Sequence, residues 1–326
     1  MWARVLGSAA GGGFPQWNCT CPVCRAVREG TRPTRARTQS SVAVSGDGER
    51  WVLLNASPDI HAQLGSFPSL RPSGRREVPL SAVLLTDAEL DHTLGLLLLR
   101  EGGGLTVHAT EAVHDTLCDG TSVLRTLEAY CPVTWQPVVP DVDVALGGGL
   151  TYRAFEVPTT KRARFGATGR RGRVVGYRLT DAGTGRALVW LPAVQALTPE
   201  VRERIDGCAC LLVDGTCWSD DELVRLGLAG KTARAMGHLP ISGPDGSLEQ
   251  LSSLRIGRTV YVHPTTPIRS CSRTRPSGGS SRSTAPRSPS TGWSCRSDDH
   301  HRDTDGHDGH RRLRGGAARA VAAVPQ

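Results

Sequence analysis

Short apolar runs that stop at polar residues constrain the fold of this chain more than any other feature. The runs lie at residues 51–55, 81–86, 187–191 and 210–214. Runs of this length are typical of buried strands that deliver side chains to a site. Helices are predicted to follow two acidic residues, over 93–100 and 221–228. Strands with helices interspersed indicate a layered α/β architecture.

The chain changes character after His263. Residues 1–263 contain the apolar runs, and we expect them to form one domain. From Pro264 onward Ser, Arg, Pro, Thr and Gly predominate, so residues 264–326 are predicted to form a low-complexity, disordered tail. A histidine-rich stretch at 300–310 within this tail also allows a less favoured interpretation as a metal-binding segment.

The formal net charge of +8 is concentrated in the predicted tail. Residues 264–326 hold 11 Arg and 5 Asp, whereas residues 1–263 hold 28 basic and 26 acidic residues. No basic patch interleaved with aromatic residues accompanies this charge, so we expect no nucleic-acid partner.

The cellular location is predicted from apolar content. No apolar run approaches the roughly 20 residues that span a bilayer, so we expect no membrane association. Residues 1–8 are too short and too weakly apolar for a signal peptide, which predicts a cytoplasmic protein. In that compartment the ten cysteines are expected to be metal ligands or buried side chains.

Three cysteines are closely spaced near the N-terminus. Cys19, Cys21 and Cys24 have the spacing C-x-C-x2-C, which lets three thiols converge on one tetrahedral metal ion with one further ligand. We predict a structural zinc here rather than three unrelated buried cysteines. Candidates for the fourth ligand are His108, His114 and Cys118.

The glycine-rich segment 7–18 directly follows a short predicted strand. Glycines permit tight turns and a close approach of the backbone to a ligand. A phosphate-binding loop is the alternative, but the segment lacks the Gly-Lys-Ser/Thr ending and the dinucleotide glycine spacing. We therefore expect a structural turn beside the active site.

A loop with three carboxylates and an imidazole follows the run at 81–86. It carries Asp87, Glu89, Asp91 and His92. Adjacent Asp and His at a strand end form a plausible metal pair, since carboxylate oxygen and imidazole together suit iron, manganese or zinc. A solvated acidic loop is the alternative.

Three more polar residues follow apolar segments and favour the metal interpretation. Asp214 ends the run at 210–214, His238 follows a helical segment, and His263 follows the expected strand at 258–262. A single histidine is more often a buried core residue than a ligand. The shared placement at strand ends indicates a common site.

With these residues assembled, the chain resembles the pyrroloquinoline quinone (PQQ) biosynthesis protein B family, a branch of the metallo-β-lactamase superfamily. The matching segments are 7–19, 36–41, 55–60, the Asp91–His92 segment, 214–216 and 237–239. The resemblance covers about residues 1–263. It implies an αββα four-layer sandwich with metal at the edge between two sheets.

The chain departs from the wider superfamily at the metal motif. Metallo-hydrolases of the superfamily carry His-x-His-x-Asp-His, and alignment on Asp91 and His92 puts Asp87 and Glu89 at the first two histidines. A two-zinc hydrolytic site needs those imidazoles. A site for one metal remains.

A ligand set of two histidines and one carboxylate is typical of non-haem iron oxygenases. We predict that Asp91, His92 and His263 hold iron(II), with zinc as the alternative metal. We predict that four further residues either orient these ligands by hydrogen bonds or serve as alternative ligands: Asp87, Glu89, Asp214 and His238.

The resemblance further implies an activity. It points to an iron-dependent hydroxylation of the tyrosine ring in a Glu-Tyr-derived PQQ precursor, with dioxygen as the other partner. Two alternatives are a non-catalytic carrier that transports PQQ or its precursor, and a zinc-dependent hydrolase. The sequence is compatible with a homodimer.

The residues after His263 suggest a damaged reading frame. Members of the resembled family continue there with Asn-Asn-Thr-Asn-Pro-Ile-Leu, and one nucleotide string can encode both that stretch and residues 265–276 in a shifted frame. We hypothesise a single-base loss just after His263, which would impair this copy. Resequencing of the gene across this junction tests the hypothesis.

Overall fold

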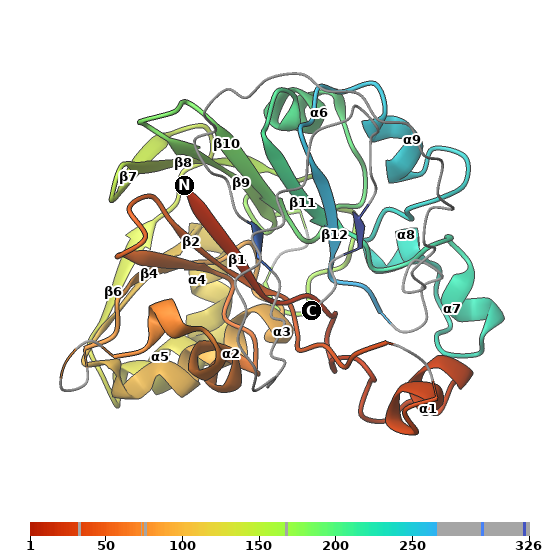
Figure 1. The fold of residues 1–326 in the computed structure, drawn as a ribbon, viewed down its shortest axis with the longest axis horizontal. Coiled ribbons are helices and arrows are strands. Elements are labelled where there is room, and N and C mark those ends of the chain that lie inside the picture. The colour runs from red at the N-terminus through yellow and green to blue at the C-terminus, as the bar shows by residue number, and fades with distance from the viewer. Residues whose placement is uncertain are drawn as a thin grey trace, which may run out of the picture.

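The structure is a computed structural model that describes residues 1–31, 34–72, 74, 77–166 and 169–265, with two short strands at 295–296 and 322–323. Two seven-stranded sheets pack face to face and helices cover their outer faces (Figure 1). The predicted αββα sandwich is thereby confirmed.

The first sheet contains the N-terminal strands in the order β13-β1-β2-β3-β4-β5-β6. Its strands are β1 (Trp2–Gly7), β2 (Ser41–Ser45), β3 (Trp51–Leu54), β4 (Leu80–Leu84), β5 (Leu105–Ala109), β6 (Val133–Pro137) and β13 (Cys295–Arg296). The strands from β3 to β6 are parallel, so the carboxyl ends of β3, β4 and β5 meet at one edge of the sheet. That edge carries the loop with the three carboxylates.

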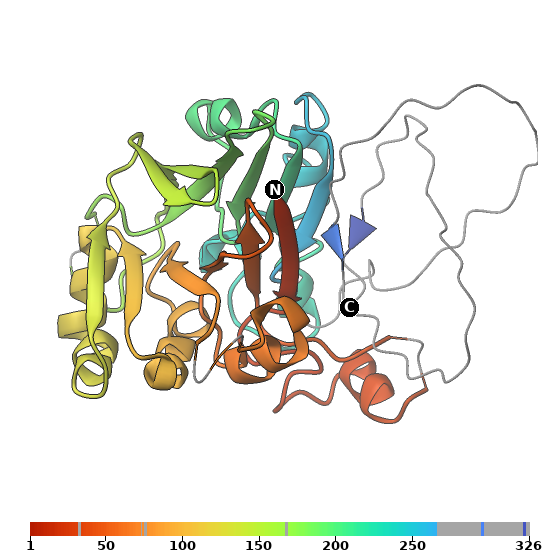
Figure 2. The same ribbon diagram turned by 60° about the vertical axis from the view of Figure 1, so that its left-hand side comes forward.

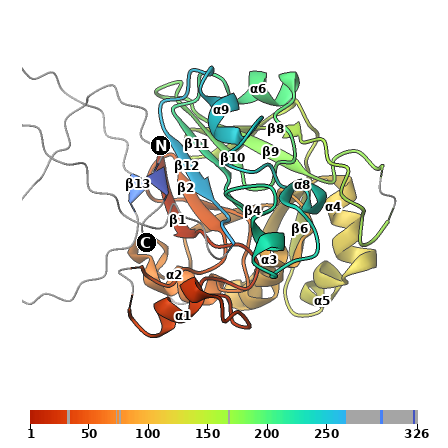
Figure 3. The same cartoon turned by 90° about the vertical axis from the view of Figure 1, so that its right-hand side faces the viewer.

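The second sheet has the order β14-β12-β11-β10-β9-β8-β7. Its strands are β7 (Asp143–Gly147), β8 (Leu150–Glu156), β9 (Val175–Asp181), β10 (Ala187–Leu191), β11 (Cys210–Asp214), β12 (Thr259–Val262) and β14 (Ala322–Ala323). Strands β10, β11 and β12 are parallel, so Asp214 and His263 leave the sheet at the same edge. Figure 3 looks onto the side of the molecule where β1 and β12 lie.

The core between the sheets is made of fully buried side chains from both. Leu54 and Leu84 of the first sheet pack in one cluster with Tyr177, Trp190 and Leu212 of the second. Strands β2, β3, β10 and β11 are buried along their whole length, because each has a sheet on one side and helices or loops on the other. Continuous apolar runs are the sequence pattern that such strands require.

Helices, 3₁₀ turns and the π-helical turn η3 cover the outer faces of the two sheets (Figure 2). The elements on the first sheet are α2 (Ile60–Ser66), η1 (Pro68–Leu70), α3 (Leu90–Thr93), η2 (Leu94–Gly102), α4 (Glu111–Asp115), η3 (Thr116–Gly120) and α5 (Val123–Glu128). The second sheet is covered by α6 (Pro199–Ile205) and α9 (Ser247–Leu251). Beyond its edge lie α1 (Pro22–Arg28), α7 (Glu222–Arg225) and α8 (Ala233–Met236). No helix of the described residues is both long and apolar enough to cross a membrane.

The helices predicted at 93–100 and 221–228 differ from those observed. The first is a 3₁₀ segment, Leu94–Gly102, after a single α-helical turn. The carbonyl of His92 accepts from Ala56 N at 2.7 Å, and Gly95 N donates to the Ala56 carbonyl at 3.0 Å. These bonds to the β3 loop replace those of a regular α-helix. The second prediction shortens to Glu222–Arg225.

The structure describes two residues beyond the predicted end of the domain at His263. Ala10 N donates to the Pro264 carbonyl at 3.0 Å, and Thr265 N donates to the Thr216 carbonyl at 3.0 Å. The rest of the predicted disordered tail, with its stretch at 300–310, lies outside the described residues, except that β13 and β14 fall within it.

Candidate metal centre

The loop that follows β4 is tied to both sheets before it reaches its charged residues. The Asn55 side chain donates from Nδ2 to Thr86 Oγ1 at 2.9 Å and accepts from Thr86 N at 3.0 Å. The Leu85 carbonyl accepts from the Tyr177 hydroxyl at 2.8 Å, and the Thr86 carbonyl accepts from Val175 N at 2.8 Å. The start of the loop is therefore fixed between β3 and β9.

Asp87 holds the ring of His92 in one orientation. The two Asp87 oxygens lie 2.9 and 2.8 Å from His92 Nδ1, and both side chains are buried. Because an ionised carboxylate can only accept, Nδ1 carries a proton. The other ring nitrogen, Nε2, is buried and has no hydrogen-bond partner among the described residues. A buried imidazole nitrogen in this position is suited to bind a metal ion.

Asp91 and His263 complete a group of three around that nitrogen. Ligand atoms of Asp91, His92 and His263 all lie within 4.8 Å of one another, and His263 Nε2 lies 3.0 Å from Asp91 Oδ2. His263 has a left-handed backbone with φ 61°, which costs a residue other than glycine about 1–3 kcal/mol. The bonds of Pro264 and Thr265 hold it there.

Asp214 positions the histidines and has no oxygen left over for a ligand. Its Oδ1 accepts from Thr216 N at 2.9 Å and from Thr216 Oγ1 at 2.7 Å. Its Oδ2 accepts from Val194 N at 3.0 Å and lies 2.7 Å from His238 Nδ1. The Thr216 hydroxyl donates its proton to Asp214 and therefore accepts a hydrogen bond from His263 Nδ1 at 3.0 Å. The other ring nitrogen of His263, Nε2, then faces Asp91.

His238 lies in a second, overlapping group. Ligand atoms of Asp214, His238 and His263 also lie within 4.8 Å of one another, and the rings of His238 and His263 stack with centroids 5.6 Å apart. The two groups share His263. The saturated carboxylate of Asp214 makes the group with Asp91 the better cation site.

The charges of the site favour a cation. Burial acts to raise the pKa of Asp91, but the neighbouring His92 and the hydrogen bond from His263 hold that pKa well below its usual range. Burial of His92 lowers its pKa, but Asp87 and Asp91 raise the pKa to about 9. His92 is therefore protonated at neutral pH when no other cation balances these carboxylates, and a metal ion would displace that proton.

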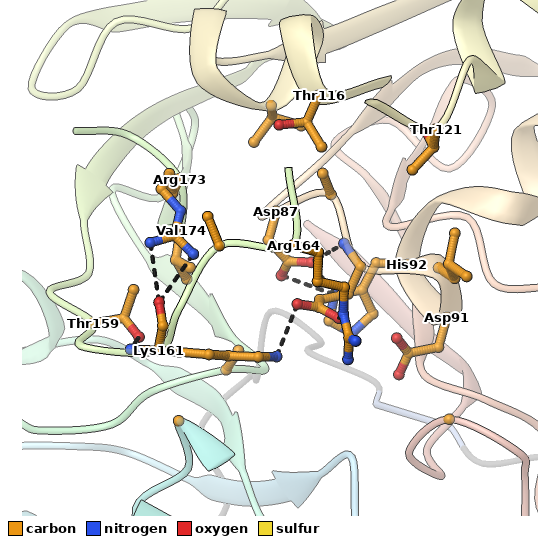
Figure 4. A pocket seen from close by; sticks show the side chains of 18 of the residues that line it. Asp87, Asp91, His92, Thr116, Thr121, Thr159, Lys161, Arg164, Arg173 and Val174 are labelled. Atoms are coloured by element: carbon orange, nitrogen blue, oxygen red, sulfur yellow. Dashed lines mark hydrogen bonds and ion pairs between the residues drawn. The ribbon is translucent and has the colours of Figure 1, made fainter. Parts of the chain in front are cut away.

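Glu89 points away from this group. Its Oε1 lies 2.8 Å from Lys161 Nζ and its Oε2 lies 3.4 Å from Arg164 Nε. Asp87 and Glu89 occupy the positions of the superfamily's first two histidines. Asp87 bonds to His92, whereas Glu89 bonds to Lys161 on the opposite wall of a pocket (Figure 4).

This pocket is a cavity of about 930 Å³ that opens above the metal group. Asp91, His92, His238 and His263 line one side of it. The segment between β8 and β9 also lines the pocket, with Val157, Phe165 and Val174 and with the cations Lys161, Arg164 and Arg173. Lys161, Arg173 and Val174 lie across the pocket from Asp91 (Figure 4). Sequence reasoning missed these cations, for which the run Lys161–Arg164 was the available signal.

The glycine-rich segment forms a turn beside the metal group. A Cβ at Gly11 would lie 3.2 Å from Asp91 Oδ2, so a larger residue would press on that carboxylate. Gly12 N donates to Gln39 Oε1 at 3.1 Å, and both residues line the pocket. A side chain at position 11 would therefore require Asp91 to shift by a few tenths of an ångström.

The three cysteines near the N-terminus also converge. The sulfur atoms of Cys19, Cys21 and Cys24 all lie within 4.8 Å of one another at the start of α1. Backbone N–H groups point at two of them, from Cys21 to Cys19 Sγ at 3.5 Å and from Cys24 to Cys21 Sγ at 3.4 Å. Burial raises the pKa of the Cys24 thiol to about 12, and a bound zinc ion would offset this by stabilising the thiolates.

None of the three candidate fourth ligands belongs to this cysteine group within the part of the chain that the structure describes. His108 Nδ1 lies 3.1 Å from the Tyr152 hydroxyl, between the sheets. The ring of His114 stacks on Trp135 with centroids 3.8 Å apart, and its Nε2 lies 3.5 Å from Cys118 Sγ.

Known proteins resemble this chain in both sequence and fold. The family model of the Beta-lactamase superfamily domain matches residues 50–264. The chain is 45% identical over 274 residues to the coenzyme PQQ synthesis protein B of Azoarcus sp. (strain BH72), covering 81% of this chain and 89% of the relative. It is 44% identical over 270 residues to the protein of the same name from Methylococcus capsulatus, with the same coverage.

Solved structures agree with these matches. The 1.98-Å crystal structure of Zn(2+)-bound PqqB from Methylobacterium extorquens superposes with a TM-score of 0.75 at 39% identity, over 81% of this chain and 89% of that one. A diphosphatase from the PhnP family superposes with a TM-score of 0.58 at 21% identity, over 81% of this chain and 86% of that one, and shares the fold.

Proposed function

We propose that this chain, which belongs to the coenzyme PQQ synthesis protein B family of the β-lactamase superfamily, acts in the biosynthesis of coenzyme PQQ by hydroxylating the tyrosine ring of a Glu-Tyr-derived precursor with dioxygen. The names of its relatives support the pathway. The observation that carries the oxidative chemistry is the unpartnered, buried Nε2 of His92 beside Asp91 and His263.

The residues present fit one metal ion. Asp91, His92 and His263 would hold it, and a set of two imidazoles and one carboxylate is the one that non-haem iron oxygenases use. Iron(II) in such a site supplies the redox chemistry that dioxygen needs to react with an aromatic ring. The superfamily's dizinc site cannot form, because Asp87 and Glu89 replace its first two histidines.

The surrounding residues fix these ligands and shape the space above them. Asp87 holds His92 and Thr216 holds His263, so that both rings present Nε2 to the same point. Val157, Phe165 and Val174 give the pocket an apolar wall against which an aromatic ring can pack.

The test of the oxidative function is dioxygen uptake. Protein purified anaerobically and loaded with iron(II) is expected to consume one dioxygen per precursor and to convert the phenol to an ortho-quinone, with the second oxygen atom leaving as water. Mass spectrometry should therefore show a product that has gained one oxygen atom and lost two hydrogen atoms. Protein that binds the precursor without uptake would instead be the carrier. Hydrolysis of ester or phosphodiester substrates by the zinc-loaded protein would support the hydrolase.

We propose a structural zinc at Cys19, Cys21 and Cys24. Replacement of Cys24 by serine is expected to remove about one zinc ion per chain and to lower the thermal stability, since structural zinc contributes directly to folding. Elemental analysis and a melting curve measure both effects. Cys118→Ser is the matched control, because Cys118 lies outside the group. Unchanged zinc in the Cys24 variant would refute the proposal.

A further inference from the structure

The wall of the pocket opposite the metal group carries a fixed ammonium group, that of Lys161 (Figure 4). Lys161 N donates to Thr159 Oγ1 at 3.1 Å. The Lys161 carbonyl accepts from both Arg173 Nη1 and Nη2 at 3.1 Å. The backbone of Lys161 is thereby held at both ends, so the point from which its side chain reaches into the pocket is fixed.

The stem of Lys161 packs across Gly237. A Cβ at Gly237 would lie 3.2 Å from Lys161 Cδ, and Gly237 has φ +95°, which disfavours any other residue. Gly237 directly precedes His238, which lines the pocket and stacks on His263. Lys161 lines the pocket, and this contact lies along its side chain on the way to the ammonium group.

A carboxylate already occupies this position. Glu89 bridges two cations, with Oε1 on Lys161 at 2.8 Å and Oε2 on Arg164 at 3.4 Å. The side chains of Lys161 and Glu89 are 30% and 34% exposed, and ion pairs with this exposure to water add little free energy. A carboxylate from a ligand can therefore replace Glu89 at small cost.

We propose that Lys161 is a specificity residue that binds a carboxylate of the substrate and takes it in exchange for Glu89. In this arrangement the phenol ring of the substrate lies toward Asp91, His92 and His263, and one of its acidic groups lies on Lys161. This inference rests on the proposed function for the placement of the ring. The acidic end is recognised by charge, and Arg164 is the second cation that reaches it.

The test is a binding series under anaerobic conditions with the iron(II)-loaded protein. Three phenols differ in carboxylate number: tyrosol has none, 3-(4-hydroxyphenyl)propanoate has one, and 4-hydroxyphenylsuccinate has two. Isothermal titration calorimetry is expected to show tighter binding with each carboxylate. Lys161→Met should weaken the two acidic phenols by roughly two- to fivefold and leave tyrosol unchanged, as expected for the loss of one partly exposed ion pair.

Two further variants test the two partners of the Lys161–Glu89 ion pair by their affinity for the acidic phenols. Glu89→Gln removes the competing carboxylate and should tighten the acidic phenols by a few-fold, whereas Lys161→Arg keeps the charge and should retain most of the affinity. Lys231→Met is the matched control, because Lys231 is the other lysine of the chain and does not line the pocket.

Three outcomes would overturn the inference: equal effects of Lys161→Met on all three phenols, no gain in Glu89→Gln, or no binding of any acidic phenol. The binding series needs no dioxygen and is therefore independent of turnover. Carboxylate-dependent binding without dioxygen uptake would refute the oxidative function alone. Uptake without carboxylate dependence would refute the role of Lys161 alone.

Discussion

Replacement of His92 by alanine is expected to weaken iron(II) binding by more than roughly 100-fold, because loss of a residue that only orients a metal ligand already costs about 10–100-fold. The change removes the buried, unpartnered Nε2 and leaves the Asp87 carboxylate without its main partner. Turnover at a fixed, limiting iron concentration should fall by at least the same factor. An anaerobic competition titration with a chelator measures the affinity.

The control for this variant is His61→Ala. His61 is an exposed histidine on α2 and lies in neither histidine group of the described residues. Its replacement should leave iron affinity and dioxygen uptake unchanged. If the His92 variant bound iron as tightly as the unaltered protein, the proposal that Asp91, His92 and His263 hold the metal would be contradicted.

Asp214→Ala is expected to destabilise the protein by about 3–5 kcal/mol, the range found when one partner of a buried ion pair is removed. Asp214 is completely buried and accepts from Val194 N and from the N–H and hydroxyl of Thr216. It also holds His238. All of these donors would stay buried without an acceptor.

Urea unfolding of metal-free protein measures this effect without any contribution from a bound ion. Asp221→Ala is the matched control, because Asp221 is exposed and pairs with Arg225 on the surface. Such a pair contributes roughly 0–1 kcal/mol. Equal unfolding free energies for the two variants would contradict the stabilising role of Asp214 at the end of β11.

The fold was predictable where burial on both faces makes the sequence uniformly apolar. The runs at 51–55, 81–86, 187–191 and 210–214 coincide with β3, β4, β10 and β11. Strands such as β7 have one exposed face and a weaker pattern, and they owe their structure to pairing with neighbours. The helix expected at 93–100 became a 3₁₀ segment because its backbone bonds to Ala56, a contact that local sequence does not contain.

The candidate site was predictable where the ligands are adjacent or end strands. Asp91 and His92 are neighbours in sequence, and His263 follows directly after β12. The different roles of Asp87 and Glu89 were not predictable, because both are acidic residues in one loop. Their separation depends on Lys161, which follows Glu89 by 72 residues and meets it only in the folded chain.

The proposed metal ligands come from both sheets, and this division would couple metal supply to the lifetime of the protein. Asp91 and His92 follow β4 of the first sheet, whereas His263 follows β12 of the second and is 172 residues from Asp91. Neither sheet alone provides the three ligands, so an ion stabilises only the docked pair, by mass action. A cell short of metal would therefore lose protein molecules to unfolding and proteolysis as well as active sites.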